Sequence, residues 1–261
     1  MKKFNLAIKF LYYLLTSKNR HGIHSPFVYH LVDKVIYNKA PQEAYARIEK
    51  IRRELKNNKK EISIEDYGAG SSVNPSKRRK ISEIATHSLK SRKYGQLLFR
   101  LVKNYKPNTI LELGTSLGIT TLYLAKGQSK GKTYTIEACP ETSAVASAVF
   151  EKAGMERIEL MNGKFETVLP ELLAQLPELD FVFFDGNHRK EPTLAYFRTC
   201  LKKAGDHSIF VFDDIHWSEE MEEAWKIIQN HPEVTFTVDL FFMGLVFFRK
   251  ERFRQHFKIR Y

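Results

Sequence analysis

The sequence predicts an α/β fold: a Rossmann-like, doubly wound sheet of seven strands, mostly parallel, with a C-terminal antiparallel hairpin and an N-terminal helical extension. Three observations predict it. From about residue 93 onward, strand-like apolar runs alternate with helical patterns, which indicates parallel strands covered by helices. Most of these runs end in a polar or acidic residue. The last two apolar runs are joined through residues 242–244, which leaves no room for a crossover helix, so they should pair antiparallel.

The chain has 261 residues, enough for one or two domains with a sizeable core. Its composition, 43% hydrophobic and 28% charged, excludes a wholly disordered or a collagen-like protein. With 42 basic and 30 acidic residues the net charge is +12, which suggests an anionic partner. The excess lies in three segments outside the enzyme-like middle of the chain: residues 1–20, 76–93 and 249–261.

Two cysteines, Cys139 and Cys200, are too few for a disulfide scaffold and form no C-x-x-C pattern, so we expect a cytoplasmic protein. Lys9 interrupts the apolar stretch at the start and no cleavage site follows, so we expect this stretch to be retained. No run approaches the ~18 apolar residues that a membrane-spanning helix needs.

We divide the chain into a helical N-terminal extension with a lid or loop, residues 1–92, and an α/β domain, residues 93–261. Apolar residues over 4–15 recur at spacings of three and four, which predicts an amphipathic helix. This helix packs on its own protein or on a dimer partner, or it lies in a membrane interface. Pro26 and Pro41 should open two further helices, and residues 61–80 lack a clear period and are expected to be a loop.

The α/β domain should contain five parallel strands followed by the two strands of the hairpin. Their expected positions are 109–113, 133–138, 158–162, 180–185, 208–214, 234–241 and 244–250.

The strongest motif is ILELGTSLGITTLYLA, in which Glu112, Gly114 and Gly118 stand where a predicted strand meets a helix. Glycine there allows a tight turn and a close approach by a ligand, while the helix N-terminus offers free N–H groups. Glu137 follows at the end of the second strand, where an acid can accept both hydroxyls of a ribose. Together these residues predict a ligand that contains adenosine.

The motif lacks the G-x-G-x-x-G of dinucleotide sites and the lysine of a P-loop, so a positively charged ligand without phosphate is favoured. Here the chain resembles the class I S-adenosylmethionine-dependent methyltransferases, whose first motif has the form E/D-x-G-x-x-x-G and whose second strand ends in an acid. The resemblance implies that S-adenosylmethionine is held by the first two strand ends and that two residues after the third strand flank its adenine. The residues implied are Glu112, Gly114, Ser116, Gly118 and Glu137, with Gly163 and Lys164 beside the adenine.

The segments KYGQLLFRLV, ETVLPELLAQLPELDFVFFDGNH and VFDD resemble the small-molecule O-methyltransferases of the catechol and caffeoyl-CoA group, over roughly residues 93–248. The resemblance implies methylation of an oxygen, or less readily a nitrogen, of a small molecule. It also implies a Mg²⁺ site at Asp185, Asp213 and Asp214, where Asp214 replaces the asparagine of that group. Related enzymes use such acids without a metal, to hold the cofactor or a base, and Asp185 is also a candidate for those roles.

His188 lies three residues after Asp185, where the O-methyltransferases carry a lysine. A neutral imidazole can take a proton from a hydroxyl, so His188 is our first candidate for the general base. Alternatively it orders the loop or pairs with Asp213. His216 is a second candidate.

Two other functions remain open from the sequence. One is an RNA methyltransferase that uses the basic segments to neutralise phosphates. The other is a non-catalytic module that binds an anionic membrane through residues 1–20. The identity of the methyl acceptor, the use of a metal and the formation of a homodimer are not determined by the sequence.

Overall fold

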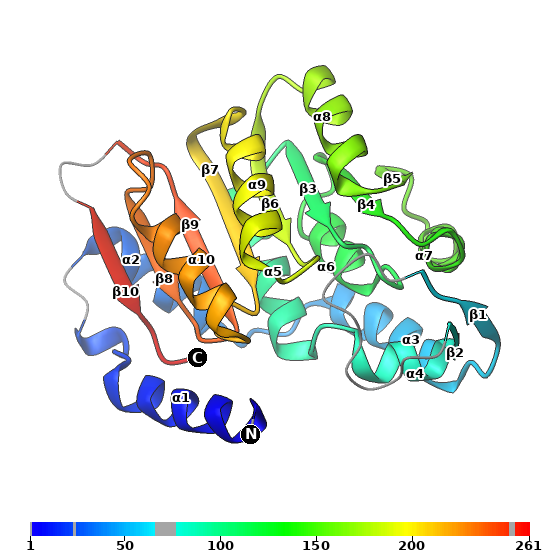
Figure 1. Cartoon of the computed structure of the whole chain (residues 1–261), viewed down its shortest axis with the longest axis horizontal. Coiled ribbons are helices and arrows are strands. Elements are labelled where there is room, and N and C mark those ends of the chain that lie inside the picture. Colours follow the sequence, from blue (N-terminus) through cyan, green and yellow to red (C-terminus); the bar gives the residue numbers. More distant parts are fainter. Residues whose placement is uncertain (1, 23–24, 66–76, 251–253) are drawn as a thin grey trace. The chain divides into compact units, whose positions relative to one another are not determined.

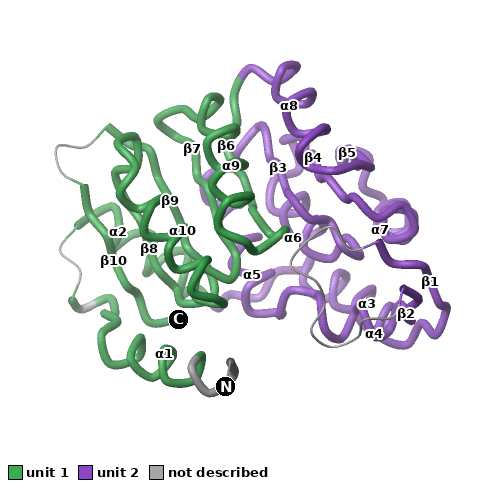
Figure 2. The backbone as a smooth tube through the Cα atoms, in the orientation of Figure 1, with its two compact units in different colours: residues 1–38, 178–261 green, residues 39–177 purple. Residues whose placement is uncertain are grey.

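The structure is a computed structural model that describes residues 2–22, 25–65, 77–250 and 254–261. It contains two compact units, one of residues 1–38 with 178–261 and the other of residues 39–177 (Figure 2). The predicted boundary between residues 92 and 93 lies inside the unit of residues 39–177. It separates residues by their expected role, not by their packing, and it stays a prediction. Within the described residues, no helix has both the length and the hydropathy needed to cross a bilayer.

The unit of residues 39–177 is built around three parallel strands in the order β3-β4-β5 (Figure 1). Its helices are α3 (Glu43–Asn57), α4 (Ile81–His87), α5 (Arg92–Tyr105), α6 (Ile119–Gly127), α7 (Pro140–Lys152) and α8 (Phe165–Gln175). Its strands are β1 (Glu61–Ser63), β2 (Arg78–Lys80), β3 (Thr109–Leu113), β4 (Lys132–Glu137) and β5 (Ile158–Asn162).

The core of this unit includes apolar side chains of the extension as well as of the strand–helix repeats. Ile48 and Leu55 of α3 are buried in one cluster with Leu122 and Tyr123 of α6. The hydroxyl of Tyr123 donates to Glu49 Oε1 at 2.8 Å. The third predicted helix is therefore part of this core, although it starts at Glu43, two residues after Pro41.

The expectation that residues 61–80 form only a loop was wrong at both ends of that segment. Residues 61–63 and 78–80 pair antiparallel as β1 and β2. The strands have only three residues each, and β2 consists of Arg78, Arg79 and Lys80, which carry no apolar alternation that could have signalled a strand. Residues 66–76, the centre of the predicted lid, lie outside the described residues.

The other unit has five strands in the order β10-β8-β9-β7-β6. Its strands are β6 (Leu179–Phe184), β7 (Ala204–Asp213), β8 (Phe236–Asp239), β9 (Met243–Phe247) and β10 (Gln255–Lys258). Its helical segments are α1 (Lys2–Thr16), the 3₁₀ turn Arg20–Gly22, α2 (Pro26–His30), the π-helical stretch Leu31–Ile36, α9 (Lys190–Leu201) and α10 (Glu219–Gln229).

The predicted fold class is confirmed: α/β, with strands mostly parallel and an antiparallel pair near the C-terminus. β6 and β7 are parallel, whereas β9 is antiparallel to both β7 and β8. One strand of this unit was missed. β10 pairs parallel with β8 and adds an eighth strand to the seven that we predicted. β10 lies in the basic tail. It is only four residues long, and the basic residues around it hide the short alternation of polar and apolar side chains that would indicate a strand.

Helices cover both faces of the strands in this unit. On one face, Trp225 of α10 packs so closely on Gly244 that a Cβ there would lie 2.6 Å from the indole. On the other face, Phe27 of α2 contacts Phe236 and Phe247 at ring centroid distances of 5.5 and 5.2 Å. Strand β6 is buried along nearly its whole length and is apolar on both faces.

Candidate functional site

The turn after β3 has a backbone that favours glycine. Gly114 and Gly118 have φ angles of 104° and 81°, and Ser116 between them has 49°. The N–H groups of Gly114 and Thr115 donate to the carbonyl of Ile136, which ties the turn to β4. Gly118 caps the N-terminus of α6, and a Cβ at this position would lie 2.6 Å from a ring carbon of Phe150. Both left-handed geometry and lack of space therefore require glycine at position 118.

Glu137 stands at the end of β4 and is fixed by the same turn. Its Oε2 accepts the backbone N–H of Ser116 at 2.9 Å, and its Oε1 accepts that of Cys139 at 3.0 Å. Each carboxylate oxygen has a second lone pair, so a half-buried Glu137 can still accept hydroxyl groups. The predicted ribose contact is compatible with this geometry.

Glu112 has a different position from the other predicted cofactor residues. Its side chain is fully buried in β3, where its Oε2 accepts the hydroxyls of Thr121 and Thr135. Thr135 is also 2.5 Å from the hydroxyl of Thr115. The carboxylate therefore joins β3, β4, α6 and the turn, so it positions the turn. The three threonines could not be inferred from the sequence, because the strand register that sets Glu112 opposite Thr135 and the packing of α6 and the turn on this carboxylate appear only in the folded chain.

Gly163 and Lys164 follow β5, next to the end of β4. Gly163 has φ 152°, its N–H donates to the carbonyl of Glu137, and a Cβ there would lie 2.6 Å from Val168. Lys164 is exposed and caps α8. The residues predicted to hold the cofactor in the unit of residues 39–177 therefore gather at the carboxyl ends of β3, β4 and β5, the edge where α/β sheets bind ligands.

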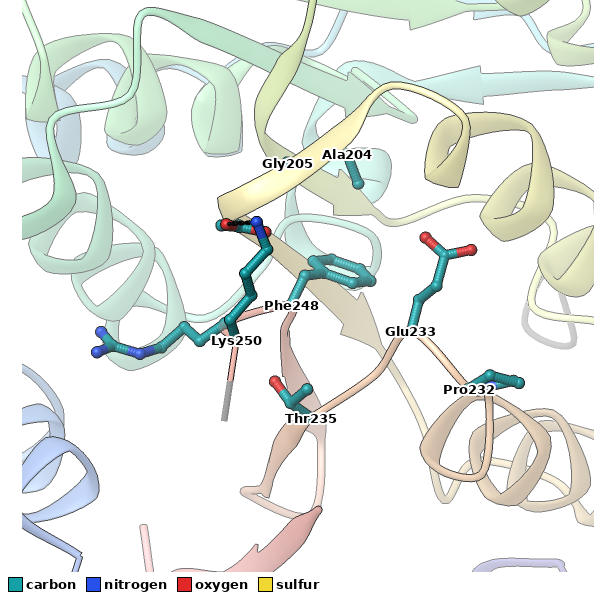
Figure 3. A pocket seen from close by; sticks show the side chains of 9 residues that line it. Ala204, Gly205, Pro232, Glu233, Thr235, Phe248 and Lys250 are labelled. Atoms are coloured by element: carbon teal, nitrogen blue, oxygen red, sulfur yellow. Dashed lines mark ion pairs between the residues drawn. The ribbon is translucent and has the colours of Figure 1, made fainter. Parts of the chain in front are cut away.

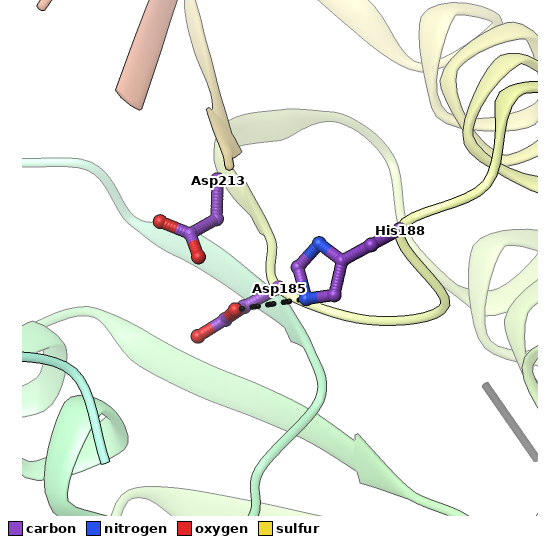
Figure 4. Close-up of side chains that lie close together, drawn as sticks. All are labelled: Asp185, His188 and Asp213. Atoms are coloured by element: carbon purple, nitrogen blue, oxygen red, sulfur yellow. Dashed lines mark ion pairs between the residues drawn. The ribbon is translucent and has the colours of Figure 1, made fainter. Parts of the chain in front are cut away.

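A second group lies in the other unit, at the carboxyl ends of β6 and β7. Asp185 follows β6, Asp213 ends β7, and the parallel register of Phe184 with Phe212 sets the two acids side by side. Figure 4 shows the two acids and His188 close together, with the ion pair of Asp185 and His188 drawn as a dashed line. One potential ligand atom from each of the three residues lies within 4.8 Å of the others. His188 Nε2 is 3.6 Å from Asp185 Oδ1.

The loop that carries His188 has an unusual backbone. Asn187 and His188 have φ angles of 66° and 37°, a region that residues other than glycine rarely adopt and that is found more often at functional sites. The amide of Asn187 donates to the hydroxyl of Tyr196 at 3.2 Å, and the N–H of His188 donates to the carbonyl of Gly186. These contacts hold the imidazole beside the two acids.

Asp214, the third residue of the implied Mg²⁺ site, does not belong to this group. Its backbone is left-handed, with φ 53°, and its N–H donates to the carbonyl of Phe242 at 2.7 Å. His188 stands with the two acids in its place. Two carboxylates and an imidazole fit a divalent cation, and burial of Asp213, which is 1% exposed, strengthens the repulsion that a cation would relieve.

His216 is held on both sides by carboxylates. Its Nδ1 lies 3.0 Å from Glu222 and its Nε2 lies 2.9 Å from Asp239, and its ring stacks on Phe241. Burial lowers the pKa of this imidazole, but the hydrogen bonds and charges of Asp239 and Glu222 outweigh burial, so the net pKa is raised. Both nitrogens are engaged, which leaves no lone pair to accept a substrate proton. The geometry therefore favours His188 over His216 as the base.

A shallow hollow of about 250 Å³ lies at the opposite, amino end of β7 (Figure 3). It is lined by Ala204, Gly205 and Phe248, and an ion pair of Lys250 with Asp206 borders it at 2.9 Å. None of the predicted site residues lines it. Because ligands of α/β sheets bind at the carboxyl ends of strands, we do not assign this hollow a role in the chemistry.

Comparison with known proteins shows which protein family the segment that carries the strand-end residues resembles. Residues 111–215, which include the turn after β3, Glu137, Asp185, His188 and Asp213, match the family model described as a methyltransferase domain. This segment of the chain is similar to methyltransferase domains. The predicted resemblance to the class I O-methyltransferases is confirmed.

Two bacterial relatives are named catechol O-methyltransferase. The one from Niastella koreensis is 30% identical over 124 residues, which are 46% of this chain and 55% of the relative. The one from Mycobacterium tuberculosis is 30% identical over 127 residues, 48% of this chain and 56% of the relative. A human relative, named transmembrane O-methyltransferase, is 40% identical over 84 residues, 31% of this chain and 29% of the relative. The matches thus span about half or less of these relatives.

Solved structures share the fold. An O-methyltransferase from Bacillus cereus in complex with S-adenosylhomocysteine matches with a TM-score of 0.58 at 19% identity, over 81% of this chain and 93% of that one. The methyltransferase PaMTH1 of Podospora anserina, also bound to S-adenosylhomocysteine, matches with a TM-score of 0.61 at 17% identity, over 87% and 97% of the two chains. At these identities the likeness establishes the fold alone.

Proposed function

We propose that this protein transfers the methyl group of S-adenosylmethionine to an oxygen atom of a small molecule. The observation that carries the proposal is the group of Asp185, His188 and Asp213 at the strand ends, within a matched methyltransferase domain. The relatives named for catechol support an oxygen acceptor. The glycine turn and the oriented carboxylate of Glu137 support an adenosyl cofactor.

Methyl transfer requires an acceptor oxygen in line with the C–S bond of the sulfonium. The oxygen bonds to the methyl carbon, the C–S bond breaks, and its electron pair stays on sulfur as S-adenosylhomocysteine. The acceptor proton must leave, and the His188 imidazole is the group that would take it. At 3.6 Å, Asp185 is beyond a normal hydrogen bond but close enough to stabilise the resulting imidazolium.

The same three side chains could instead hold Mg²⁺, with Asp185 and Asp213 as oxygen ligands and His188 as a nitrogen ligand. When bound, such an ion lowers the pKa of a hydroxyl that coordinates it. The two roles of His188 exclude each other, because an imidazole nitrogen that binds a metal cannot accept the proton. Metal dependence of the reaction therefore distinguishes them.

Methylation of 1,2-dihydroxybenzene, used as a simple probe acceptor, tests the proposal with the full chain and labelled S-adenosylmethionine. We expect His188→Gln to lower kcat by ~10²–10⁴-fold without changing cofactor affinity. His207→Gln is the matched control, because His207 is exposed on β7 at the end away from Asp213. A fully active His188→Gln variant would show that His188 neither accepts the proton nor holds an essential ion. Activity that a chelator abolishes and Mg²⁺ restores, together with a weaker apparent affinity for Mg²⁺ in His188→Gln, would assign His188 to the ion.

The RNA alternative is not favoured by the structure. Two of its basic segments contribute to edge strands, β2 and β10, and Arg78 of β2 pairs with Glu61 at 3.6 Å. The expected cytoplasmic location agrees with two buried cysteines that are both free thiols.

A further inference from the structure

Helix α1 exposes an apolar face that its own unit does not cover. Between residues 6 and 16, its exposed positions follow a helical spacing of one, three and four residues. They are Ala7, Ile8, Leu11, Tyr12, Leu15 and Thr16. The exposed fractions of Ile8, Leu11, Tyr12 and Leu15 are 53%, 59%, 62% and 77%. No charged residue stands among these positions, although solvent-facing helix positions are normally polar.

The opposite face of α1 is the one that packs on the protein. Phe10 contacts Phe241 at a ring centroid distance of 4.9 Å, and the buried Tyr13 donates its hydroxyl to the carbonyl of Ile259. Lys9 pairs with Glu222 at 3.0 Å. The helix is therefore apolar on two faces, and only one of them is used within the protein. A helix that is apolar all round is normally buried on all sides, so the outer face is built to be covered.

Positive charge borders the outer face. Lys258 of β10 places its ammonium 5.2 Å from the ring of Tyr12. Exposed Lys18 follows the helix, and its main chain is hydrogen bonded to Lys258 and Arg260. The side chains of Lys258 and Arg260 bond to Thr16 and to the carbonyl of Leu14, so these bases lie at the end of α1. The first 20 residues contain five basic residues and no acidic one.

We propose that α1 is an interfacial helix that docks the protein on an anionic membrane surface. Its four large apolar side chains would enter the boundary between headgroups and acyl chains, with Tyr12 at headgroup level. Lys258, Lys18 and Arg260 would contact acidic headgroups. The helix lies on the surface and does not span it, in agreement with its 15 residues. This inference does not depend on the proposed function.

A second copy of the chain fits the outer face less well. In a symmetric dimer the patch meets its own copy, so the bases at the end of α1 would face a second segment of residues 1–20, which contains five basic residues and no acidic one to pair with them. The area is also small: four side chains of ~200 Å² each, exposed by half to three quarters, offer on the order of 500 Å², against ~800 Å² per partner in stable interfaces. An anionic bilayer matches both the charge and the size.

Co-sedimentation of the full chain with vesicles tests the inference. We expect binding to vesicles of phosphatidylcholine with phosphatidylglycerol, little binding to pure phosphatidylcholine, and weaker binding as salt rises. The double variant Leu11→Glu with Leu15→Glu should lose at least about tenfold in vesicle affinity, because both side chains leave the apolar phase. Ile227→Glu is the matched control, since Ile227 is an apolar residue of α10 that is 41% exposed in the same unit.

Circular dichroism and thermal unfolding of each variant establish that it is folded. Equal vesicle binding by the double variant and the control would overturn the inference, as would absence of binding by the unmodified chain to anionic vesicles. Light scattering in solution tests whether a second copy of the chain covers the outer face of α1. If the unmodified chain is a dimer and the double variant is a monomer, the face belongs to a second copy, and the membrane proposal is overturned.

Discussion

Replacing Gly118 by alanine should destabilise the protein and weaken cofactor binding for two separable reasons. The φ of 81° is a left-handed conformation, which costs an L-residue roughly 1–2 kcal/mol. In addition, the new Cβ would lie 2.6 Å from Phe150 Cε1 and 3.0 Å from its Cζ, and overpacking of this kind costs roughly 1–3 kcal/mol. We therefore expect Gly118→Ala to lower the free energy of unfolding by about 2–5 kcal/mol.

Gly154 provides the matched control for the backbone contribution. Its φ is also positive, at 61°, but a Cβ there would meet nothing within 4 Å. Gly154→Ala should therefore show only the conformational cost, and the difference between the two variants measures the contact with Phe150. Urea unfolding gives both free energies, and titration with S-adenosylhomocysteine should show weaker binding only for Gly118→Ala. Equal destabilisation by the two substitutions would refute the argument that Phe150 excludes a side chain at position 118.

Three further outcomes are expected. Asp213→Asn should lower methyl transfer by ~10²-fold or more and leave affinity for S-adenosylhomocysteine unchanged, measured by steady-state kinetics and calorimetry, because the proposed function assigns this acid to the methyl acceptor. Thr135→Val keeps the shape of the side chain but removes the hydroxyl that donates to the buried Glu112, so the free energy of unfolding should fall by about 1–3 kcal/mol. A change within experimental error would show that this hydrogen bond does not stabilise the protein. The raised pKa of His216 means that its stabilising charge is present below its ordinary value of 6.5 and is lost as pH rises through the folded-state pKa. The unmodified protein should therefore lose more stability than His216→Gln as the pH rises above 6.5; parallel pH profiles would contradict this.

The parts of the fold that rest on local pattern were predictable. Strand positions followed from apolar runs such as residues 180–185, and the hairpin of β8 and β9 followed from a connection too short for a helix. Strands without such a pattern were missed. β2 consists of three basic residues, and β10 depends on pairing with β8 rather than on its own apolar content.

The candidate site was predictable where chemistry follows directly from position in the chain. Acids at strand ends, such as Asp185 and Asp213, come together because parallel strands end at the same edge. Backbone direction could not be predicted in the same way. Asp214 is adjacent to Asp213 in sequence, but a left-handed turn and a bond to Phe242 keep it out of the group. Nor could the sequence show that Asp239 and Glu222 occupy both nitrogens of His216, since these residues come from β8 and α10.

Calorimetric titration of the full chain with S-adenosylhomocysteine, with and without Glu137→Ala, tests most directly whether the ends of β3 and β4 recognise an adenosyl group. Loss of charge-assisted hydrogen bonds worth about 1.5–3 kcal/mol should weaken binding by roughly 10- to 100-fold. Glu141→Ala is the control, because Glu141 is a nearby acid whose carboxylate is engaged with the N–H of Ser63. Saturable binding that falls only with Glu137→Ala is the expected result. Absence of binding by the unmodified chain, or equal binding by all three proteins, would contradict the account.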